Sequence, residues 1–318
     1  MKILVTGAAG FIGSHLAEGI RDLGHDVVGI DCLTDFYSVA LKQQNMKSLE
    51  GKGIRVHRQD LTHADIAPLI EDIDVVFHCA AQPSISANIP LTEYWKDNVV
   101  ATHNLVGYAR RLPHLKGFVY ISSSSVYGAY AGGPETTEPK PVSMYGVTKL
   151  ASEQIVLAET RKNGFPGCSA RLFSVYGPRE RPDKLYFQLI RCAVQSRPFN
   201  LFRSSLVHER SYTFVGDAVQ GLLLILGNLS RCVGQIFNIG SDKAVSTAEG
   251  IRMIEGLTRC RIVINESPQR AGDQVRTRAN IDKARDILGF APSVDLYEGL
   301  ERQVDWFSKD VMPKIHLL

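Results

Sequence analysis

Short apolar stretches alternate with longer segments of helical periodicity through the first half of the chain. The apolar stretches are rich in β-branched residues, as in strands that are buried on both faces, and the longer segments repeat their apolar residues every three or four positions. This alternation predicts a doubly wound α/β fold, in which helices cover a parallel sheet. The first helix is expected from about Ser14. The expected strands are residues 3–6, 26–31, 54–59, 75–79 and 118–121.

The pattern loosens after Tyr176 into Pro- and Arg-rich loops, short helices and a hairpin-like segment at 262–265. Residues 212–240 are strongly apolar again and are expected to return to the main sheet. We therefore predict a large domain of residues 1–174 plus about 212–240. The remaining residues, 175–211 and 241–318, are expected to form a smaller α/β lobe that closes over a ligand.

Composition excludes several classes of protein. The chain has 318 residues, 44% hydrophobic and 22% charged, with a net charge of only +3, which does not suggest a nucleic-acid-binding protein. The six cysteines show no spacing typical of a metal site or a disulfide framework, so we expect reduced thiols, no bound metal and a cytoplasmic protein. No signal peptide is recognised, and the longest apolar stretch, 222–226, is too short to cross a membrane.

Three glycines follow the first expected strand in the pattern G-x-x-G-x-x-G: Gly7, Gly10 and Gly13. Glycines at such a position let backbone amides approach a pyrophosphate at the start of a helix. The second strand ends at Asp31, where a carboxylate can accept hydrogen bonds from both hydroxyls of an adenosine ribose and would repel a 2′-phosphate, so NAD is favoured over NADP. Asp60 could meet the adenine amino group. Either aspartate could instead be an ordinary turn residue.

A serine cluster at 122–125 follows the fifth expected strand, and Tyr145 and Lys149 lie further along the chain. Tyrosine and lysine four residues apart share one face of a helix, so the ammonium is expected near the phenol. It would lower the pKa of the phenol and make Tyr145 a usable base. The alternative is an amphipathic helix with a packed tyrosine and a solvated lysine tip. The order of these motifs along the chain favours the catalytic interpretation.

These residues resemble the extended short-chain dehydrogenase/reductase family, the NAD-dependent sugar-nucleotide epimerases and dehydratases, which have a Rossmann-type sheet. The resemblance covers nearly the whole chain. By the family pattern, the catalytic hydroxyl is that of Ser123. The motifs that carry the resemblance are TGAAGFIG at 6–13, HCAA at 78–81, DNV at 97–99, SVYG at 125–128, YGxxK at 145–149 and RSYTFV at 210–215.

The resemblance implies a reaction that begins at C4 of a nucleotide-activated sugar. Tyr145 would take the proton of the 4-hydroxyl, Ser123 would hold its oxygen, and hydride would leave C4 for NAD. Dehydratases carry an Asp-Glu pair where this chain has Ser124 and Ser125, and uronate decarboxylases carry a Glu at the second of these positions. Without those carboxylates, the implied outcome is 4-epimerisation, with hydride returned to the other face of the sugar.

UDP-glucuronate 4-epimerases are the most similar subfamily. The similarity rests on the hydroxyl residue Ser174 and on the motif VYGPRxRP that follows it at 175–182. The resemblance assigns Arg181 to the uronate carboxylate, which a guanidinium can hold with two hydrogen bonds. That grip would keep a 4-keto uronate, a β-keto acid, from losing CO2. The alternatives are that Arg181 is a solvated loop residue and that the substrate is UDP-glucose or UDP-N-acetylglucosamine. UDP-glucuronate decarboxylation is less favoured.

The resemblance also assigns Arg210 and Arg270 to the nucleotide diphosphate and Gln188 to the uracil or ribose. Relatives usually have Gly-Asp-Gly before the Arg210 strand, but this chain has Arg-Ser-Ser at 203–205, so that turn must be built differently. The implied catalytic residues are Ser123, Tyr145 and Lys149. The implied cofactor-binding residues are Gly7, Gly10, Phe11, Ile12, Asp31, Asp60, Leu61, Ala80, Ala81, Asn98, Tyr145 and Lys149, and the implied substrate-binding residues are Ser84, Ser123, Ser124, Ser174, Arg181, Gln188, Arg210 and Arg270.

Two further expectations concern assembly and activity. The resemblance implies a homodimer that is joined through the helices near residues 99–111 and 145–161. A protein that merely binds NAD without turnover is the rival from another functional class. The intact set of Ser123, Tyr145 and Lys149 argues against it, because a non-catalytic scaffold would not need all three.

Overall fold

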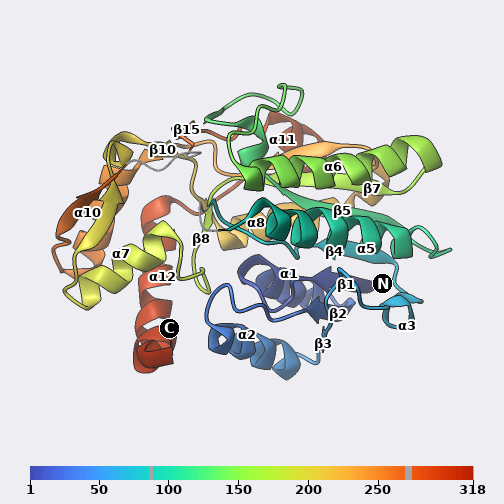
Figure 1. Cartoon of the computed structure of the whole chain (residues 1–318), viewed down its shortest axis with the longest axis horizontal. Coiled ribbons are helices and arrows are strands. Elements are labelled where there is room, and N and C mark those ends of the chain that lie inside the picture. The colour runs from blue at the N-terminus through green and yellow to red at the C-terminus, as the bar shows by residue number, and fades with distance from the viewer. Residues whose placement is uncertain (86–88, 269–273, 318) are drawn as a thin grey trace.

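A parallel sheet of seven strands forms the centre of the computed structural model, which describes residues 1–85, 89–268 and 274–317 (Figure 1). The chain starts in the middle of this sheet, fills one edge and then crosses to the other, so the strand order reverses between the first and fourth strands. The predicted doubly wound sheet is thereby confirmed. In spatial order the strands are β12 (Ile236–Ile239), β7 (Gly167–Leu172), β5 (Gly117–Ser123), β4 (Val75–His78), β1 (Lys2–Thr6), β2 (Asp26–Asp31) and β3 (Arg55–Arg58).

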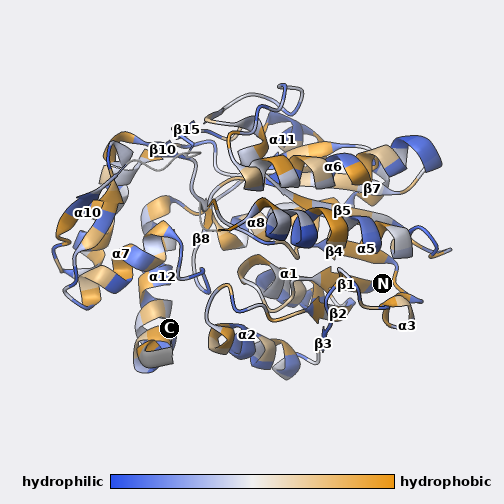
Figure 2. Cartoon of the chain, in the orientation of Figure 1, coloured by the Kyte–Doolittle hydropathy of each residue, from blue (hydrophilic) through white to orange (hydrophobic). Residues whose placement is uncertain are grey.

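Helices cover both faces of the sheet, and two hydrophobic clusters lie beneath them. Figure 2 shows hydrophobic and hydrophilic residues side by side on the covering helices, as expected where one face packs and the other meets solvent. One face carries α1 (Phe11–Asp22), α2 (Val39–Gly51), α8 (Val215–Gly227), α9 (Leu229–Cys232) and α11 (Asp282–Leu288), and the other carries α3 (Ala67–Ile70), α4 (Leu91–Tyr94), the π-helix η1 (Trp95–Val100), α5 (Ala101–Ala109) and α6 (Met144–Asn163).

The central strands carry continuous apolar runs because both of their faces are buried. In β1, Ile3 and Val5 belong to the cluster under α1 and α8, whereas Leu4 belongs to the cluster under α5 and α6. This arrangement produces the continuous apolar runs seen in the sequence. It also leaves the carboxyl ends of the strands as the place where polar side chains gather.

A smaller group of elements lies beside the carboxyl ends of the sheet, on the left of Figure 1. Its helices α7, α10 and α12 pack on one another, and its strands form short separate sheets. The elements are α7 (Leu185–Val194), α10 (Thr247–Thr258), α12 (Leu296–Trp306), η3 (Ser205–Val207), η4 (Phe307–Val311), η5 (Met312–Leu317), β6 (Tyr130–Ala131), β8 (Val175–Tyr176), β9 (Phe199–Phe202), β10 (Glu209–Arg210), β11 (Thr213–Phe214), β13 (Val245–Ser246), β14 (Ile264–Ser267) and β15 (Arg276–Thr277). The 3-10 turn η2 (Ser124–Tyr127) follows β5.

The structure confirms some of the predicted elements and corrects others. Residues 212–240 do return to the main sheet, because β12 pairs with β7 in parallel. The hairpin expected at 262–265 is wrong, because β14 pairs in parallel with β9, a strand distant in sequence. The first helix begins at Phe11 rather than Ser14, directly after the glycine that caps it. The division into two domains at residues 174/175 stays a prediction. None of the described helices is long and apolar enough to span a membrane.

Candidate active site

A cavity of about 690 Å³ lies at the carboxyl ends of the sheet strands and reaches the smaller lobe. Ligands of doubly wound sheets bind at this edge, where the strand order reverses. Asn98 is the one described residue of the predicted site that does not line the cavity, and Arg270 lies outside the described residues. The predicted residues in its wall are Gly7, Gly10, Phe11, Ile12, Asp31, Asp60, Leu61, Ala80, Ala81, Ser84, Ser123, Ser124, Tyr145, Lys149, Ser174, Arg181, Gln188 and Arg210.

The glycine loop between β1 and α1 leaves no room for side chains. Gly7 has a φ of +67°, and a Cβ atom there would lie 2.8 Å from the Ala80 amide nitrogen. A Cβ atom on Gly13 would lie 2.1 Å from the Gly7 carbonyl oxygen. Gly10 is the N-cap of α1, and no side chain within the described ranges caps this helix. The amides of its first turn are therefore open to an anion, as in phosphate-binding loops.

Asp31 and Asp60 also line the cavity. The carboxylate of Asp31 accepts hydrogen bonds from the amides of Ala9 (3.0 Å) and Leu33 (2.8 Å), so it ties the glycine loop to the end of β2. The carboxylate of Asp60 accepts from the amide (2.9 Å) and hydroxyl (2.7 Å) of Thr62. Both aspartates thus organise turns and also line the cavity. For each of them, a role as a turn residue is compatible with a role in cofactor binding.

Asn98 supports the cavity wall instead of forming it. Its Oδ1 accepts from the Gln82 amide at 2.7 Å, and its Nδ2 donates to the Thr148 hydroxyl at 2.9 Å. The side chain is buried between the loop after β4 and helix α6, which uses its polar atoms. The prediction of direct contact with the cofactor is therefore not supported. Asn98 instead fixes the loop that carries Ala80 and Ala81.

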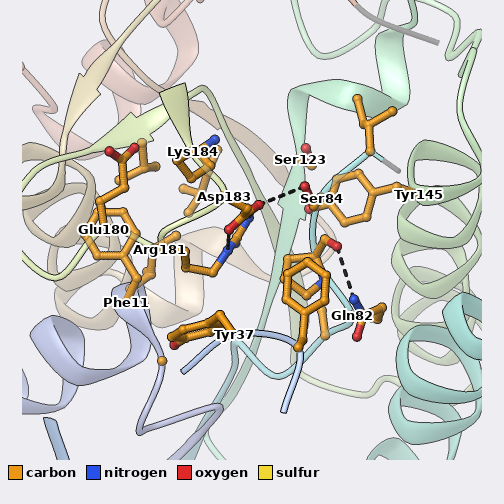
Figure 3. A pocket seen from close by; sticks show the side chains of 18 of the residues that line it. Phe11, Tyr37, Gln82, Ser84, Ser123, Tyr145, Glu180, Arg181, Asp183 and Lys184 are labelled. Atoms are coloured by element: carbon orange, nitrogen blue, oxygen red, sulfur yellow. Dashed lines mark hydrogen bonds and ion pairs between the residues drawn. The ribbon is translucent and has the colours of Figure 1, made fainter. Parts of the chain in front are cut away.

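Tyr145 and Ser123 lie together in the cavity, as Figure 3 shows. Ser123 ends β5, and Tyr145 stands in the first turn of α6, whose N-cap Ser143 accepts from the Gly146 amide at 3.1 Å. Burial raises the pKa of the Tyr145 phenol, whereas a hydrogen bond with Ser123 and the charge of Arg181 act to lower it. Both residues therefore help the phenol to ionise.

Lys149 lies one helical turn after Tyr145, but its side chain turns toward β5. Its Nζ donates to the Ile121 carbonyl at 2.5 Å and lies 4.3 Å from the centre of the Tyr120 ring. Burial lowers the pKa of Lys149 to about 7. The expectation that this ammonium lowers the pKa of Tyr145 is therefore not met in this structure. The cation that acts on the phenol is Arg181.

Arg181 and Asp183 form an ion pair in the wall of the cavity (Figure 3). Arg181 Nε donates to Asp183 Oδ1 at 2.9 Å and Nη2 donates to Oδ2 at 3.0 Å, and the Ser84 hydroxyl also donates to Oδ2 at 2.9 Å. The Arg181 side chain is only 17% exposed, so it is not a solvated loop arginine. Burial opposes ionisation of Asp183, but the charge and hydrogen bonds of Arg181 hold the pKa of this carboxyl well below its usual value.

The remaining predicted substrate residues of the described chain also line the cavity. Ser84 and Ser174 have positive φ angles of 77° and 25°, conformations that cost energy in residues with a side chain and that concentrate at functional sites. Gln188 Nε2 donates to the Asp183 carbonyl at 3.1 Å, so it braces the loop of the ion pair. The Ser124 carbonyl accepts from Gln274 Nε2 at 3.1 Å.

The comparison with protein families decides which family the site belongs to. Residues 3–240 match the model of the NAD dependent epimerase/dehydratase family. The chain belongs to this family. The predictions of an enzyme of the epimerase type and of NAD as its cofactor are confirmed.

Individual members of the epimerase/dehydratase family resemble the chain over nearly its full length. The Uncharacterized UDP-glucose epimerase YtcB of Bacillus subtilis (strain 168) is 36% identical over 97% of this chain and 98% of its own length. UDP-glucuronate 4-epimerase 1 of Arabidopsis thaliana is 31% identical, with 96% of this chain and 76% of that protein covered. The crystal structure of a UDP-glucuronic acid 4-epimerase from Bacillus cereus, in complex with UDP-glucuronic acid and NAD, superposes with a TM-score of 0.93 at 34% identity and covers 97% of this chain and 99% of that chain.

The geometry of this epimerase-family site fits NAD. Gly7, Gly10 and Gly13 line the cavity, their close backbone packing excludes side chains, and no side chain within the described ranges caps the start of α1. Asp31, Tyr145 and Lys149 line the same cavity. We expect the glycine loop to hold the pyrophosphate and Asp31 to discriminate against a 2′-phosphate.

Sequence reasoning missed several residues of the site. Tyr37 lies below the Arg181 guanidinium (Figure 3), and Asp183 holds that guanidinium from the other side. Lys184 and His208 also line the cavity. Asp183 could have been noticed, since it stands two residues after Arg181. Nothing in the sequence shows that the loop containing Tyr37, which follows β2, approaches an arginine so far along the chain.

Glu180, next to Arg181, is a buried carboxyl with a raised pKa. Its Oε2 accepts from Gln303 Nε2 at 2.6 Å and from the Phe187 amide at 3.1 Å. Burial raises the pKa of Glu180 from its ordinary value of 4.5 to about 7. A folded-state pKa above the unfolded value means that this group favours folding most below pH 4.5 and that the contribution is lost as the pH rises through 7.

We expect Glu180→Gln to remove this loss of stability. Between pH 4 and pH 8, the free energy of unfolding of the wild type should fall by roughly 3 kcal/mol relative to that of the variant, since one pKa unit corresponds to about 1.4 kcal/mol. Urea unfolding of both proteins at the two pH values measures the difference, and Glu50→Gln on the exposed end of α2 is the matched control. A difference in unfolding free energy between the wild type and Glu180→Gln that stays constant with pH would contradict the raised pKa of Glu180.

Proposed function

We propose that this epimerase interconverts UDP-glucuronate and UDP-galacturonate by inversion at C4. The observation that carries the proposal is the position of Arg181, whose guanidinium lies in the cavity close enough to Tyr145 to influence the pKa of its phenol. Nε and Nη2 face Asp183, which leaves Nη1 for a ligand as far as the described residues show. A sugar whose C4 faces Tyr145 would bring a carboxylate at C5 to this nitrogen.

Tyr145 acts as the base in this proposal. Its phenolate takes the proton of the sugar 4-hydroxyl, and Ser123 holds the same oxygen with its own hydroxyl. The glycine loop and Asp31 would hold NAD, which would supply the hydride acceptor and donor for C4. The protonated Tyr145 then delivers its proton to the oxygen of the inverted product. Lys149, with its pKa of about 7, can exchange a proton near neutral pH.

Arg181 has a second task in this scheme, which is to keep the carboxylate on the substrate. A 4-keto uronate loses CO2 when its carboxylate turns perpendicular to the plane of the carbonyl. A guanidinium that holds the carboxylate restrains this rotation. Ser124 and Ser125 supply no carboxyl at the positions where the similar dehydratases and decarboxylases carry acids. Both features support rotation of the keto sugar and return of hydride.

Epimerisation of UDP-glucose is the second candidate, favoured by a specific feature of the same site. Asp183 neutralises much of the Arg181 charge, so the sugar end of the cavity is less positive than a lone arginine would make it. The Ser84–Asp183–Arg181 group could equally hydrogen-bond the hydroxyl of a neutral hexose. The name of the Bacillus subtilis relative points in the same direction.

Proton NMR of the purified protein with UDP-glucuronate tests the proposal. New anomeric signals of UDP-galacturonate, without signals of a UDP-pentose, are the expected result. A parallel sample with UDP-glucose should react much more slowly. Turnover of UDP-glucose alone would overturn the choice of uronate, and formation of UDP-pentose would overturn epimerisation.

We also propose a homodimer that is joined near the start of α6. Leu91 and Trp95, on α4 and η1, are 47% and 48% exposed, and Met144, at the start of α6, is 51% exposed. These elements contact one another, so the three exposed apolar side chains belong to one group of packed elements. Exposed apolar groups of this size on a folded chain are typical of subunit interfaces.

Trp95→Glu should convert the dimer to a monomer, because a buried charge without a partner would destabilise an apolar interface by several kcal/mol. Light scattering coupled to gel filtration measures the mass. Tyr130→Glu is the control, since Tyr130 is 70% exposed but stands on β6, which is not one of these three elements. A monomeric wild type, or a Trp95→Glu protein that remains dimeric, would contradict the proposed interface.

A further inference from the structure

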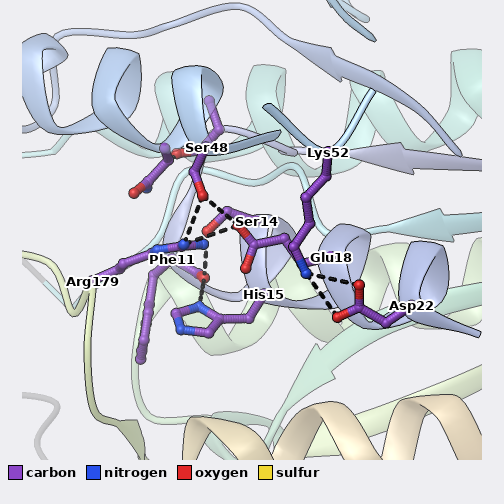
Figure 4. A network of polar contacts seen from close by, with 10 residues as sticks. Phe11, Ser14, His15, Glu18, Asp22, Ser48, Lys52 and Arg179 are labelled. Atoms are coloured by element: carbon purple, nitrogen blue, oxygen red, sulfur yellow. Dashed lines mark hydrogen bonds and ion pairs between the residues drawn. The ribbon is translucent and has the colours of Figure 1, made fainter. Parts of the chain in front are cut away.

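The loop that carries Arg181 is attached to the cofactor side of the molecule by Arg179. Arg179 Nη2 donates to Glu18 Oε1 at 2.9 Å and to the Ser48 hydroxyl at 3.2 Å, and Ser48 in turn donates to Glu18 Oε1 at 2.7 Å (Figure 4). Glu18 belongs to α1 and Ser48 to α2. The Arg179 and Glu18 side chains are 19% and 15% exposed, so solvent screens this ion pair less than a surface pair.

Helices α1 and α2 provide a fixed support for this contact. Asn45 of α2 donates from Nδ2 to the Ala9 carbonyl of the glycine loop at 2.9 Å, which links the two helices at the cofactor site. The Arg179 side chain therefore joins the loop that carries Arg181 to helices α1 and α2, which also support the glycine loop. Burial opposes ionisation of Glu18, but the hydrogen bonds and charge of Arg179 and the Ser48 hydroxyl lower the pKa of its carboxyl.

The backbone of the loop is unusual at Arg179 itself. Its φ is +66°, a conformation that disfavours residues with a Cβ atom and persists only where the surroundings impose it. The next residue, Glu180, is fastened to Gln303 of α12. Three consecutive side chains thus point in three directions: Arg179 to α1, Glu180 to α12 and Arg181 into the cavity. Anchors at the first two positions fix the direction of the third.

We propose that Arg179 is a positioning residue for the sugar site. Its contacts with Glu18 and Ser48 hold the loop backbone so that Arg181 presents its guanidinium beside Tyr145. This inference rests on the proposed function, because it takes Arg181 as the ligand of the substrate carboxylate. Arg179 itself points away from the cavity and touches no reacting group.

Glu18→Gln tests the role of this contact with little change in shape. We expect the KM for UDP-glucuronate to rise about tenfold while kcat changes less than about threefold, since Tyr145 and Ser123 stay in place. Asp22→Asn is the matched control. Asp22 stands on the same helix and pairs with Lys52 at the end of α2 at 2.7 Å, and none of its described contacts reaches the Arg179 loop. Asp22→Asn should leave both constants unchanged.

A double-mutant cycle separates positioning from general stability. If Arg179 acts through Arg181, Glu18→Gln should raise KM no further once Arg181→Ala is present. If the two effects multiply instead, the contact is merely structural and the inference is overturned. Should Glu18→Gln fold poorly, Ser48→Ala removes the bridging hydroxyl more mildly and is expected to show the same non-additive behaviour.

Hydrogen exchange distinguishes failure of this inference from failure of the proposed function. In Glu18→Gln, the amides of residues 177–184 should exchange about tenfold faster than in the wild type and in Asp22→Asn. This measurement needs no substrate. A wild type that does not act on UDP-glucuronate would refute the proposed function. The exchange rates would still show whether the contact between Arg179 and Glu18 holds the loop in place. Unchanged exchange in Glu18→Gln would overturn the positioning role of Arg179.

Discussion

Tyr145→Phe is expected to lower kcat for UDP-glucuronate by about a thousandfold or more and to change the affinity for the substrate little. Loss of the hydroxyl removes the group that takes and returns the proton of the sugar 4-hydroxyl in the proposed mechanism, and a positioned acid–base group contributes roughly 10²–10⁴-fold to a rate. The aromatic ring remains, so the wall of the cavity keeps its shape. Turnover by NMR and binding by calorimetry measure the two effects.

Tyr127→Phe is the control for Tyr145→Phe. Tyr127 is also a buried tyrosine, and its hydroxyl donates to Asn238 Oδ1 at 2.8 Å, but it is not among the residues of the cavity wall. It should lower stability without a comparable effect on kcat. A Tyr145→Phe protein that retains near wild-type turnover would show that another group is the base.

Arg181→Ala is expected to have the second largest effect, and the effect should depend on the sugar. We predict a fall of about a hundredfold in kcat/KM for UDP-glucuronate and of less than about fivefold for UDP-glucose, because only the uronate offers a carboxylate to the guanidinium. Arg181→Lys keeps the charge without the planar pair of donors and should be intermediate. Initial rates with both sugars provide the ratio.

The partner of Arg181 complicates this variant and supplies its control. Arg181→Ala leaves the Asp183 carboxylate without the cation that lowers its pKa, and a free carboxylate would repel the uronate. Arg181→Ala combined with Asp183→Asn removes this repulsion. If the combined variant still prefers UDP-glucose, the lost recognition is that of Arg181. Equal losses on both sugars would show that Arg181 does not recognise the carboxylate.

The sequence predicted the sheet and the tight glycine loop well, for physical reasons that are local. Strands buried on both faces must be continuously apolar, and a turn without room for a Cβ atom must be glycine, as at Gly7 and Gly13. Such requirements can be recognised within a few residues. The positions of Ser123 and Tyr145 at strand and helix ends follow from the same pattern.

The errors concern contacts between distant parts of the chain. The periodicity of α6 places Lys149 on the same face as Tyr145, but it cannot show that the Ile121 carbonyl of β5 accepts the ammonium. It likewise cannot show that Arg181, from a loop some 36 residues later, supplies the charge that acts on the phenol. The parallel pairing of β14 with β9 was missed because its residues alone do not reveal the partner strand.

The most direct test of the account uses UDP-glucuronate labelled with deuterium at C4 and the purified protein in ordinary water. The account predicts UDP-galacturonate that keeps the deuterium at C4, because the hydrogen leaves the carbon and returns to it without exchange with solvent. NMR and mass spectrometry read the label and the product together. Loss of the deuterium to water, or a product other than UDP-galacturonate, would contradict it.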